Sequence, residues 1–150
     1  MSTLDKAAEI AASAHRGQVD KYGQPYILHP IRVMARLDSI ESKIVAILHD
    51  VVEDSEITID DLRAHGFSDQ IIEAVILLTK GEDQDYTQYV SRLAHNPLAR
   101  AVKLADLEDN MDLRRMTTLT DADFKRLQRY HWAWLFLNEI KQSGKHGGSQ

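Results

Sequence analysis

Apolar residues recur at intervals of three and four along most of the chain, a spacing typical of amphipathic helices. The first such segment covers residues 4–14, and Gly17 provides a C-terminal exit for it. Residues 18–30 (QVDKYGQPYILHP) carry glycine and two prolines, which predicts a loop. Pro30 suits the first turn of the next helix, so a helix is expected to continue through IRVMARLD.

Capping residues and apolar spacing predict the rest of the fold. Thr58, Ser68 and Asn96 each precede an apolar run and can cap a helix through their side chains. The further helices are expected at residues 42–52, 58–65, 69–80, 86–94, 98–111 and 121–141. Residues 143–150 (SGKHGGSQ) are expected to be disordered. Since no repeat or linker divides the chain, the sequence predicts one all-α domain over residues 1–142.

Composition narrows the classes of function. A chain of 150 residues without cysteine can form a core without disulfides, and it has no thiolate metal ligands. The formal net charge of −5 argues against general nucleic-acid binding. No apolar run is long enough for a membrane span, and the N-terminus does not resemble a signal peptide. We therefore expect a cytoplasmic protein with neither nucleic acid nor membrane as partner.

The segment AILHDVVEDSEI, residues 46–57, places charged groups among apolar ones. On a single helix, His49 and Glu53 would share one stripe and Asp50 and Asp54 the next, so all four would face one cleft. A solvated acidic helix end would explain the segment taken alone. Acidic residues near a helix C-terminus oppose the helix dipole, however, and a bound cation would offset that cost.

Two more positions extend this group. His29 stands at a loop-to-helix junction directly before Pro30, and Asp106 follows an apolar stretch of a helix expected to be buried. Each has an ordinary structural explanation by itself. Together with His49 and Asp50 they supply two imidazoles and two carboxylates, a set that suits Mn²⁺ or another divalent transition metal rather than Ca²⁺.

The ordered segments AHRGQ…GQPYILHP, ILHDVVED and VKLADLEDN resemble the HD-domain metal phosphohydrolases. Within that family they are similar to the RelA/SpoT-type hydrolase domains and to the stand-alone small alarmone hydrolases, over roughly residues 4–115. The resemblance implies a helical bundle with a central metal-binding cleft. It also implies hydrolysis of the 3′-pyrophosphate of guanosine tetra- or pentaphosphate, giving GDP or GTP and pyrophosphate.

The resemblance also implies a role for each matching position. The implied metal ligands, with Mn²⁺ as the usual ion, are His29, His49, Asp50 and Asp106. The implied catalytic pair that activates or orients water is Glu53 and Asp54. The implied substrate contacts are Asn110 at the nucleotide sugar, Lys21 near the phosphates, and Arg16 and Lys80 as further anion contacts.

The chain departs from the family pattern at two places. Asp20 stands where the relatives carry an arginine near the base, and Leu107-Glu108-Asp109 replaces the usual Arg-Leu-His before Asn110. The substrate therefore stays open between guanosine tetraphosphate and another nucleotide, such as an adenosine analogue or NADPH. A non-catalytic nucleotide sensor is the alternative from another class. The aromatic residues near Trp132 are expected to pack on the core or at a homo-oligomer interface.

Overall fold

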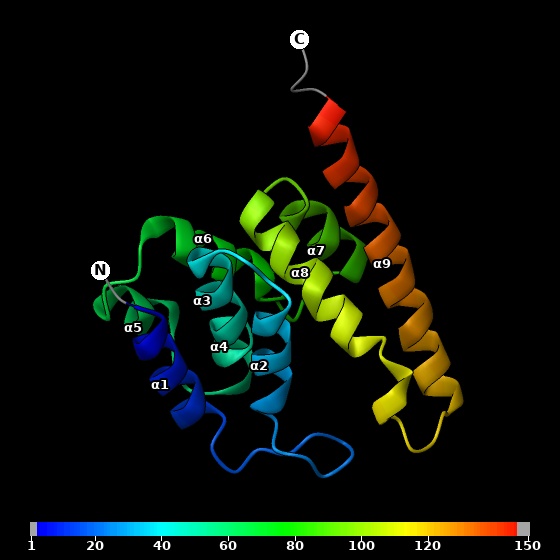
Figure 1. The fold of residues 1–150 in the computed structure, drawn as a ribbon, viewed down its shortest axis with the longest axis horizontal. Helices are drawn as coiled ribbons and strands as arrows, with labels where there is room; N and C mark the ends of the chain where they lie inside the picture. The colour runs from blue at the N-terminus through cyan, green and yellow to red at the C-terminus, as the bar shows by residue number, and fades with distance from the viewer. Residues whose placement is uncertain (1–2, 147–150) are drawn as a thin grey trace.

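The computed structural model describes residues 3–146, and within that range its regular elements are helices, apart from one isolated bridge between Val19 and Pro25 (Figure 1). In chain order they are α1 (Leu4–Ala14), α2 (Leu28–Ala35), α3 (Ile40–Leu48), α4 (Val51–Asp54), α5 (Ile59–Ala64), α6 (Asp69–Leu78), α7 (Tyr86–Leu93), α8 (Pro97–Asn110), the 3₁₀ turn η1 (Leu113–Arg115) and α9 (Asp121–His146). The all-α prediction is confirmed. Within this range, no helix has the length and apolar character that a membrane span requires.

The centre of the bundle is α3, which contacts α1, α2, α6 and α8. Val45 and Leu48 of α3 pack with Val102 and Leu107 of α8 in one apolar core, and all four are fully buried. Burial of each such side chain stabilises the fold by about 1.5–3 kcal/mol. The core therefore fixes the C-terminal end of α3 and the C-terminal half of α8, which carry most of the polar residues described below.

The expected continuous helix over residues 42–52 is wrong, because the chain breaks between α3 and α4. The His49 ring Nδ1 donates to the Ala46 carbonyl oxygen, and the His49 backbone N–H reaches the same oxygen at 3.5 Å. That carbonyl oxygen would otherwise accept the next helical bond, so the side chain competes with the helix ladder. A second short helix then starts with Asp50 as its N-cap residue.

The long helix α9 packs along α8 at one side of the bundle and extends beyond it at its C-terminal end (Figure 1). It begins where the sequence predicts: Asp123 N–H donates to the Thr120 hydroxyl, while the Asp123 carboxylate accepts from Thr120 N–H. The predicted disordered tail is wrong at its start, since Ser143 lies within α9. Its remainder, 147–150, lies outside the described residues.

The predicted packing of the α9 aromatic residues is only partly seen. The rings of Trp132 and Phe136 stack with centroids 5.5 Å apart, but Trp132 is 40% exposed. Phe124 and Leu135 on the same helix are also exposed. An interface between two copies of the chain stays a prediction.

Candidate metal centre and substrate pocket

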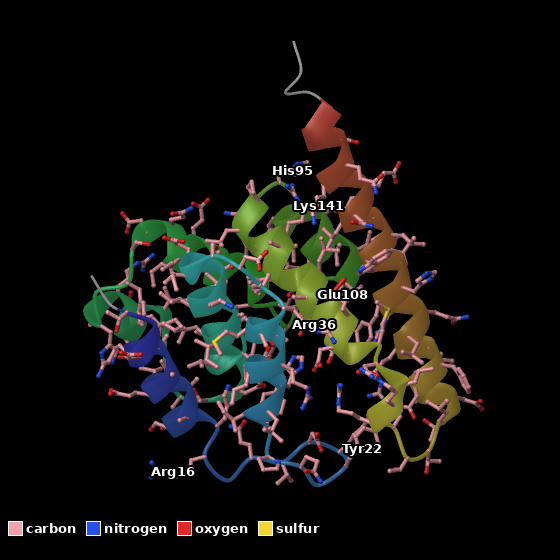
Figure 2. The ribbon with its side chains drawn as sticks, in the orientation of Figure 1. Arg16, Tyr22, Arg36, His95, Glu108 and Lys141 are labelled. Atoms are coloured by element: carbon pink, nitrogen blue, oxygen red, sulfur yellow. The ribbon has the colours of Figure 1, made fainter. Side chains whose placement is uncertain are left out.

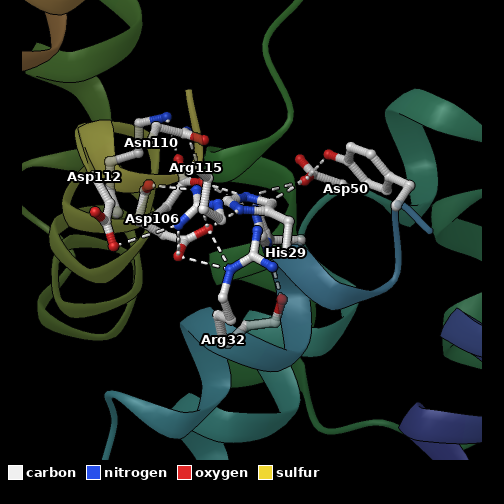
Figure 3. A network of polar contacts seen from close by, with 12 residues as sticks. His29, Arg32, Asp50, Asp106, Asn110, Asp112 and Arg115 are labelled. Carbon is white, nitrogen blue, oxygen red and sulfur yellow. Dashed lines mark hydrogen bonds and ion pairs between the residues drawn. The ribbon is translucent and has the colours of Figure 1, made fainter. Parts of the chain in front are cut away.

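The four predicted ligands come from three places in the chain and lie close together, and Figure 3 labels His29, Asp50 and Asp106 among them. His29 lies in the first turn of α2, His49 and Asp50 lie at the break between α3 and α4, and Asp106 lies on α8. Asp106 Oδ1 is 2.8 Å from His29 Nε2 and 3.3 Å from His49 Nε2. Asp50 Oδ2 is 3.1 Å from His49 Nε2 and 3.8 Å from His29 Nε2.

These distances and atom types fit a divalent transition metal. Ligands bound at about 2.1 Å to an octahedral ion lie roughly 3 Å from their neighbours. His29 Nδ1 donates to Asp109 Oδ2 at 2.7 Å, and His49 Nδ1 donates to the Ala46 carbonyl, so both rings present Nε2 to the site. His49 Nε2 is buried and has no hydrogen-bond partner within the described range. Imidazole nitrogens and carboxylate oxygens are the donors that manganese and its neighbours accept.

The carboxylates of this group are ionised. Burial alone would raise the pKa of Asp50, but the neighbouring His49 outweighs it and lowers the pKa to about 2. Burial opposes ionisation of Asp106 too, and the Lys103 ammonium holds its pKa well below the usual range. Burial lowers the pKa of His29, but hydrogen bonds to Asp106 and Asp109 raise it to about 9. Without an ion, the carboxylates and the imidazoles of this group therefore pair with one another, and a metal ion that binds here takes the place of the imidazole protons.

Asp109 belongs to the site although the sequence analysis assigned it no role. It is fully buried, and its carboxylate accepts from three donors: His29 Nδ1 at 2.7 Å, Arg32 Nε at 2.9 Å and Arg115 Nη1 at 3.2 Å. A carboxylate that binds the second nitrogen of a ligating histidine fixes its ring orientation. The unusual acidic residue before Asn110 was the one signal that pointed to this position.

The two residues of the predicted acidic pair differ in whether they line the pocket. Glu53 lines the pocket, and its Oε1 accepts from the backbone N–H of Lys80 at 2.5 Å. Loss of solvent around its carboxyl raises the pKa of Glu53, which suits a group that takes up a proton. Asp54 stands at the end of α4 and is not among the lining residues. Glu53 is therefore the better placed of the two.

The predicted substrate contacts also differ in whether they line the pocket. Lys21, Lys80 and Asn110 line the pocket, and Asn110 Nδ2 donates to Asp106 Oδ1 at 3.3 Å. Lys21 pairs through its ammonium with Asp123 at the start of α9. Arg16 is exposed beyond the end of α1 and does not line the pocket, so the structure does not place it with the others (Figure 2).

The pocket has a volume of about 600 Å³, within the range of small-molecule sites. The metal centre lies along one part of its wall. Side chains that the sequence analysis left out line it opposite α2 and α3, namely Tyr86 and Tyr89 of α7 and Arg126, Arg129 and Tyr130 of α9. These side chains reach the pocket only because α7 and α9 pack beside it in the folded chain, and the local sequence does not reveal that packing.

The comparisons agree with this geometry. A family model described as HD domain matches residues 7–126. The chain belongs to the HD domain family. It is 36% identical to a mouse protein named guanosine-3′,5′-bis(diphosphate) 3′-pyrophosphohydrolase MESH1, covering 87% of this chain and 80% of that protein. It is also 32% identical to a Vibrio cholerae protein described by the same enzyme name, of which it spans only 20%.

A solved structure of an HD-domain relative supports the fold. Its title is "A metazoan ortholog of SpoT hydrolyzes ppGpp and plays a role in starvation responses", and the TM-score is 0.66. The match covers 95% of this chain and 96% of that one at 24% sequence identity. This likeness confirms the predicted helical bundle, and the family model over residues 7–126 confirms the resemblance to the HD-domain family.

Proposed function

We propose that this HD domain is a metal-dependent hydrolase that removes the 3′-pyrophosphate of guanosine tetra- or pentaphosphate, leaving GDP or GTP. The observation that carries the proposal is the meeting of His29, His49, Asp50 and Asp106 in the wall of a cation-lined pocket. Support also comes from the mouse relative, whose printed name describes this activity and most of whose length this chain matches.

The four ligand residues would hold the ion, which we propose to be Mn²⁺. When bound, such an ion supplies a Lewis acid for a phosphoryl oxygen and lowers the pKa of a water. Glu53 takes the proton of the attacking water, since its carboxyl lines the pocket and has a raised pKa. Hydrolysis breaks the bond between the ribose 3′-oxygen and phosphorus, and the 3′-oxygen ends as a hydroxyl. Lys21 and Lys80 stabilise the negative charge of the departing pyrophosphate.

Pyrophosphate release from guanosine tetraphosphate in Mn²⁺ tests the proposal. The parent protein is expected to release pyrophosphate, and Asp50→Ala is expected to lose this activity together with metal binding. Glu53→Gln is expected to bind the metal normally while kcat falls by about 10²–10⁴-fold. Release from the parent no greater than from Asp50→Ala would contradict the proposed function.

The base preference rests on the loop that carries Asp20. Asp20 Oδ1 accepts the backbone N–H groups of Tyr22 at 2.9 Å and Gln24 at 3.0 Å, so this carboxylate shapes the loop at the edge of the pocket. We propose that guanine is still the base read here, because the other carboxylate oxygen can accept from a guanine edge. A panel of guanosine tetraphosphate, its adenosine analogue and NADPH tests this, with metal analysis of the purified protein to identify the ion. We further propose a cytoplasmic location, which suits this substrate class.

A further inference from the structure

A row of cations and aromatic rings leads along the pocket wall from the metal centre to α9. Lys103 Nζ donates to the ligand residue Asp106 at 2.9 Å and lies 5.2 Å from the centroid of the Tyr89 ring. The Tyr89 and Tyr86 ring centroids are 6.1 Å apart, and the Arg129 guanidinium lies 5.6 Å from the centroid of Tyr86. All five residues line the same pocket. The row therefore connects the reacting end of the pocket with a second positive group.

The two residues at the α9 end of this row have unused binding capacity. Tyr86 Oη is buried without a hydrogen-bond partner in the described part of the chain, whereas Tyr89 Oη donates to the Leu78 carbonyl at 2.8 Å. A buried hydroxyl without a partner costs free energy that a ligand atom can recover. Tyr86 lines the pocket, so a polar group of a bound ligand is the partner that we expect for this hydroxyl.

Arg129 differs from the other arginines that line the pocket in its charge pairing within residues 3–146. Lys21 and Arg126 both pair with Asp123, whereas no carboxylate pairs with Arg129 in residues 3–146. Its guanidinium is held over an aromatic face and keeps its positive charge free. A guanidinium beside a phenolic hydroxyl offers several donors to a single phosphate.

We propose that Arg129 and Tyr86 bind the 5′-phosphates of the substrate, which lie on the side of the nucleotide remote from the metal. The inference rests on the proposed function, because a nucleotide with a 3′-pyrophosphate at the metal centre carries its second charged group on the 5′ side. The pocket joins both places in one cavity of about 600 Å³. Arg129 and Tyr86 would thus select nucleotides that are phosphorylated at both positions.

The test compares two substrates and two variants. Arg129→Gln is expected to raise KM for guanosine tetraphosphate by about 10- to 100-fold, the effect of losing a charged hydrogen bond. Tyr86→Phe removes only the hydroxyl and is expected to raise KM by about 3- to 10-fold. In both variants kcat is expected to stay close to the parent value. With guanosine 3′-diphosphate, which has a free 5′-hydroxyl, both variants are expected to behave as the parent does.

The matched control is Arg92→Gln, which removes an exposed arginine of α7 that does not line the pocket. This variant is expected to leave the KM of both guanosine tetraphosphate and guanosine 3′-diphosphate unchanged. Circular dichroism verifies that each variant is folded, and Arg129→Lys retains a charge and is expected to recover part of the affinity. An equal rise in KM for both substrates would overturn the inference. A rise in KM that depends on the base of the nucleotide, and not on the presence of its 5′-phosphates, would also overturn the inference, because that result indicates base stacking.

Binding of GDP, measured by calorimetry, separates this inference from the proposed function. GDP carries the 5′-diphosphate but has no 3′-pyrophosphate to hydrolyse, so its affinity reports the second subsite alone. Arg129→Gln is expected to weaken GDP binding by about 10- to 100-fold. If the parent hydrolyses no guanosine tetraphosphate yet shows this difference, the proposed function fails while the subsite stands. Equal GDP affinity in parent and variant, or no binding by the parent, contradicts the subsite.

Discussion

At the residue scale, Asp109 shows how the metal centre is supported. Its side chain is fully buried and carries a charge, which is tolerated because His29, Arg32 and Arg115 all donate to it. Burial raises the pKa of Asp109, but the hydrogen bonds from His29 and Arg32 lower it below the usual value. Asp109 is thus a positioning residue that orients one ligand ring and ties it to two arginines.

Asp109→Asn is expected to weaken Mn²⁺ binding by about 10- to 100-fold, because the amide keeps the shape of the side chain but not its charge. The Arg32 and Arg115 guanidinium groups then lose their ionic partner and the His29 ring is held less firmly. Calorimetric titration with Mn²⁺ measures the change without any substrate. Asp60→Asn serves as the control, since Asp60 is an exposed residue of α5 that pairs with the neighbouring Arg63 and does not line the pocket. Equal Mn²⁺ affinity in parent and Asp109→Asn would show that the contact is structural only.

The sequence predicted the residues of the candidate metal centre that belong to motifs, and it missed those that only the folded chain places beside that centre. His29, His49, Asp50 and Asp106 stand at fixed places in the motifs, and the structure brings all four together. The role of Asp109 depends on arginines from α2 and from the turn after α8, whose convergence no local spacing reveals. Arg16 lies within the segment AHRGQ but not among the residues that line the pocket, so its contact with the substrate stays a prediction.

At the scale of elements, the first turn of α9 is joined to the loop before α2. The Asp123 carboxylate accepts from the Lys21 ammonium, from Arg126 Nη2 at 2.8 Å and from Thr120 N–H at 2.9 Å. One carboxylate therefore caps α9 and fastens a loop more than a hundred residues earlier in the chain. Both joined segments line the pocket, so this contact holds its two sides together.

The stability given by Asp123 is expected to depend on pH. The hydrogen bond from Lys21, followed by those from Thr120, holds the pKa of Asp123 well below its usual range. A lowered carboxyl pKa stabilises the fold fully above the unfolded pKa of about 3.9, and that contribution is lost as pH falls towards the folded pKa. Asp123→Asn is therefore expected to have a lower Tm than the parent, by a constant amount above about pH 5 and by a shrinking amount below about pH 4.

Thermal unfolding followed by circular dichroism between pH 3 and 8 measures this difference. Asp121→Asn, at an exposed position in the same turn, is the control and is expected to have no comparable effect. A Tm difference that stays constant down to the lowest pH would show that Asp123 acts through packing rather than through its charge.

Helix boundaries were predicted well where caps mark them and poorly where the signal is a side-chain contact. Thr58, Ser68 and Asn96 cap the helices that the sequence assigned to them. The break at His49 was missed, because the apolar spacing continues through it while the ring bonds the carbonyl of Ala46. The pocket-facing side of α9 was also missed, since apolar side chains occur on both its buried and its exposed faces.

At the scale of the whole molecule, the metal centre joins parts of the chain that lie far apart in sequence. His29 comes from α2, His49 and Asp50 follow α3, and Asp106 comes from α8, and these helices also pack together in the core. A ligand set assembled only by folding binds an ion far better in the folded than in the unfolded state. An ion bound by these four residues would then stabilise the whole domain and not just the site.

Addition of Mn²⁺ at 100 times its Kd is therefore expected to stabilise the fold by about 2.7 kcal/mol. For a chain of this size, that corresponds to a rise in Tm of roughly 5–10 °C over the protein in EDTA. The measurement is thermal unfolding in Mn²⁺ and in EDTA, with Ca²⁺ expected to give a smaller rise because imidazole is a poor ligand for it. Asp50→Asn is expected to remove the response, while Asp60→Asn, at an exposed residue that does not line the pocket, keeps it. An equal Tm in Mn²⁺ and EDTA would mean that the four side chains do not form a metal site.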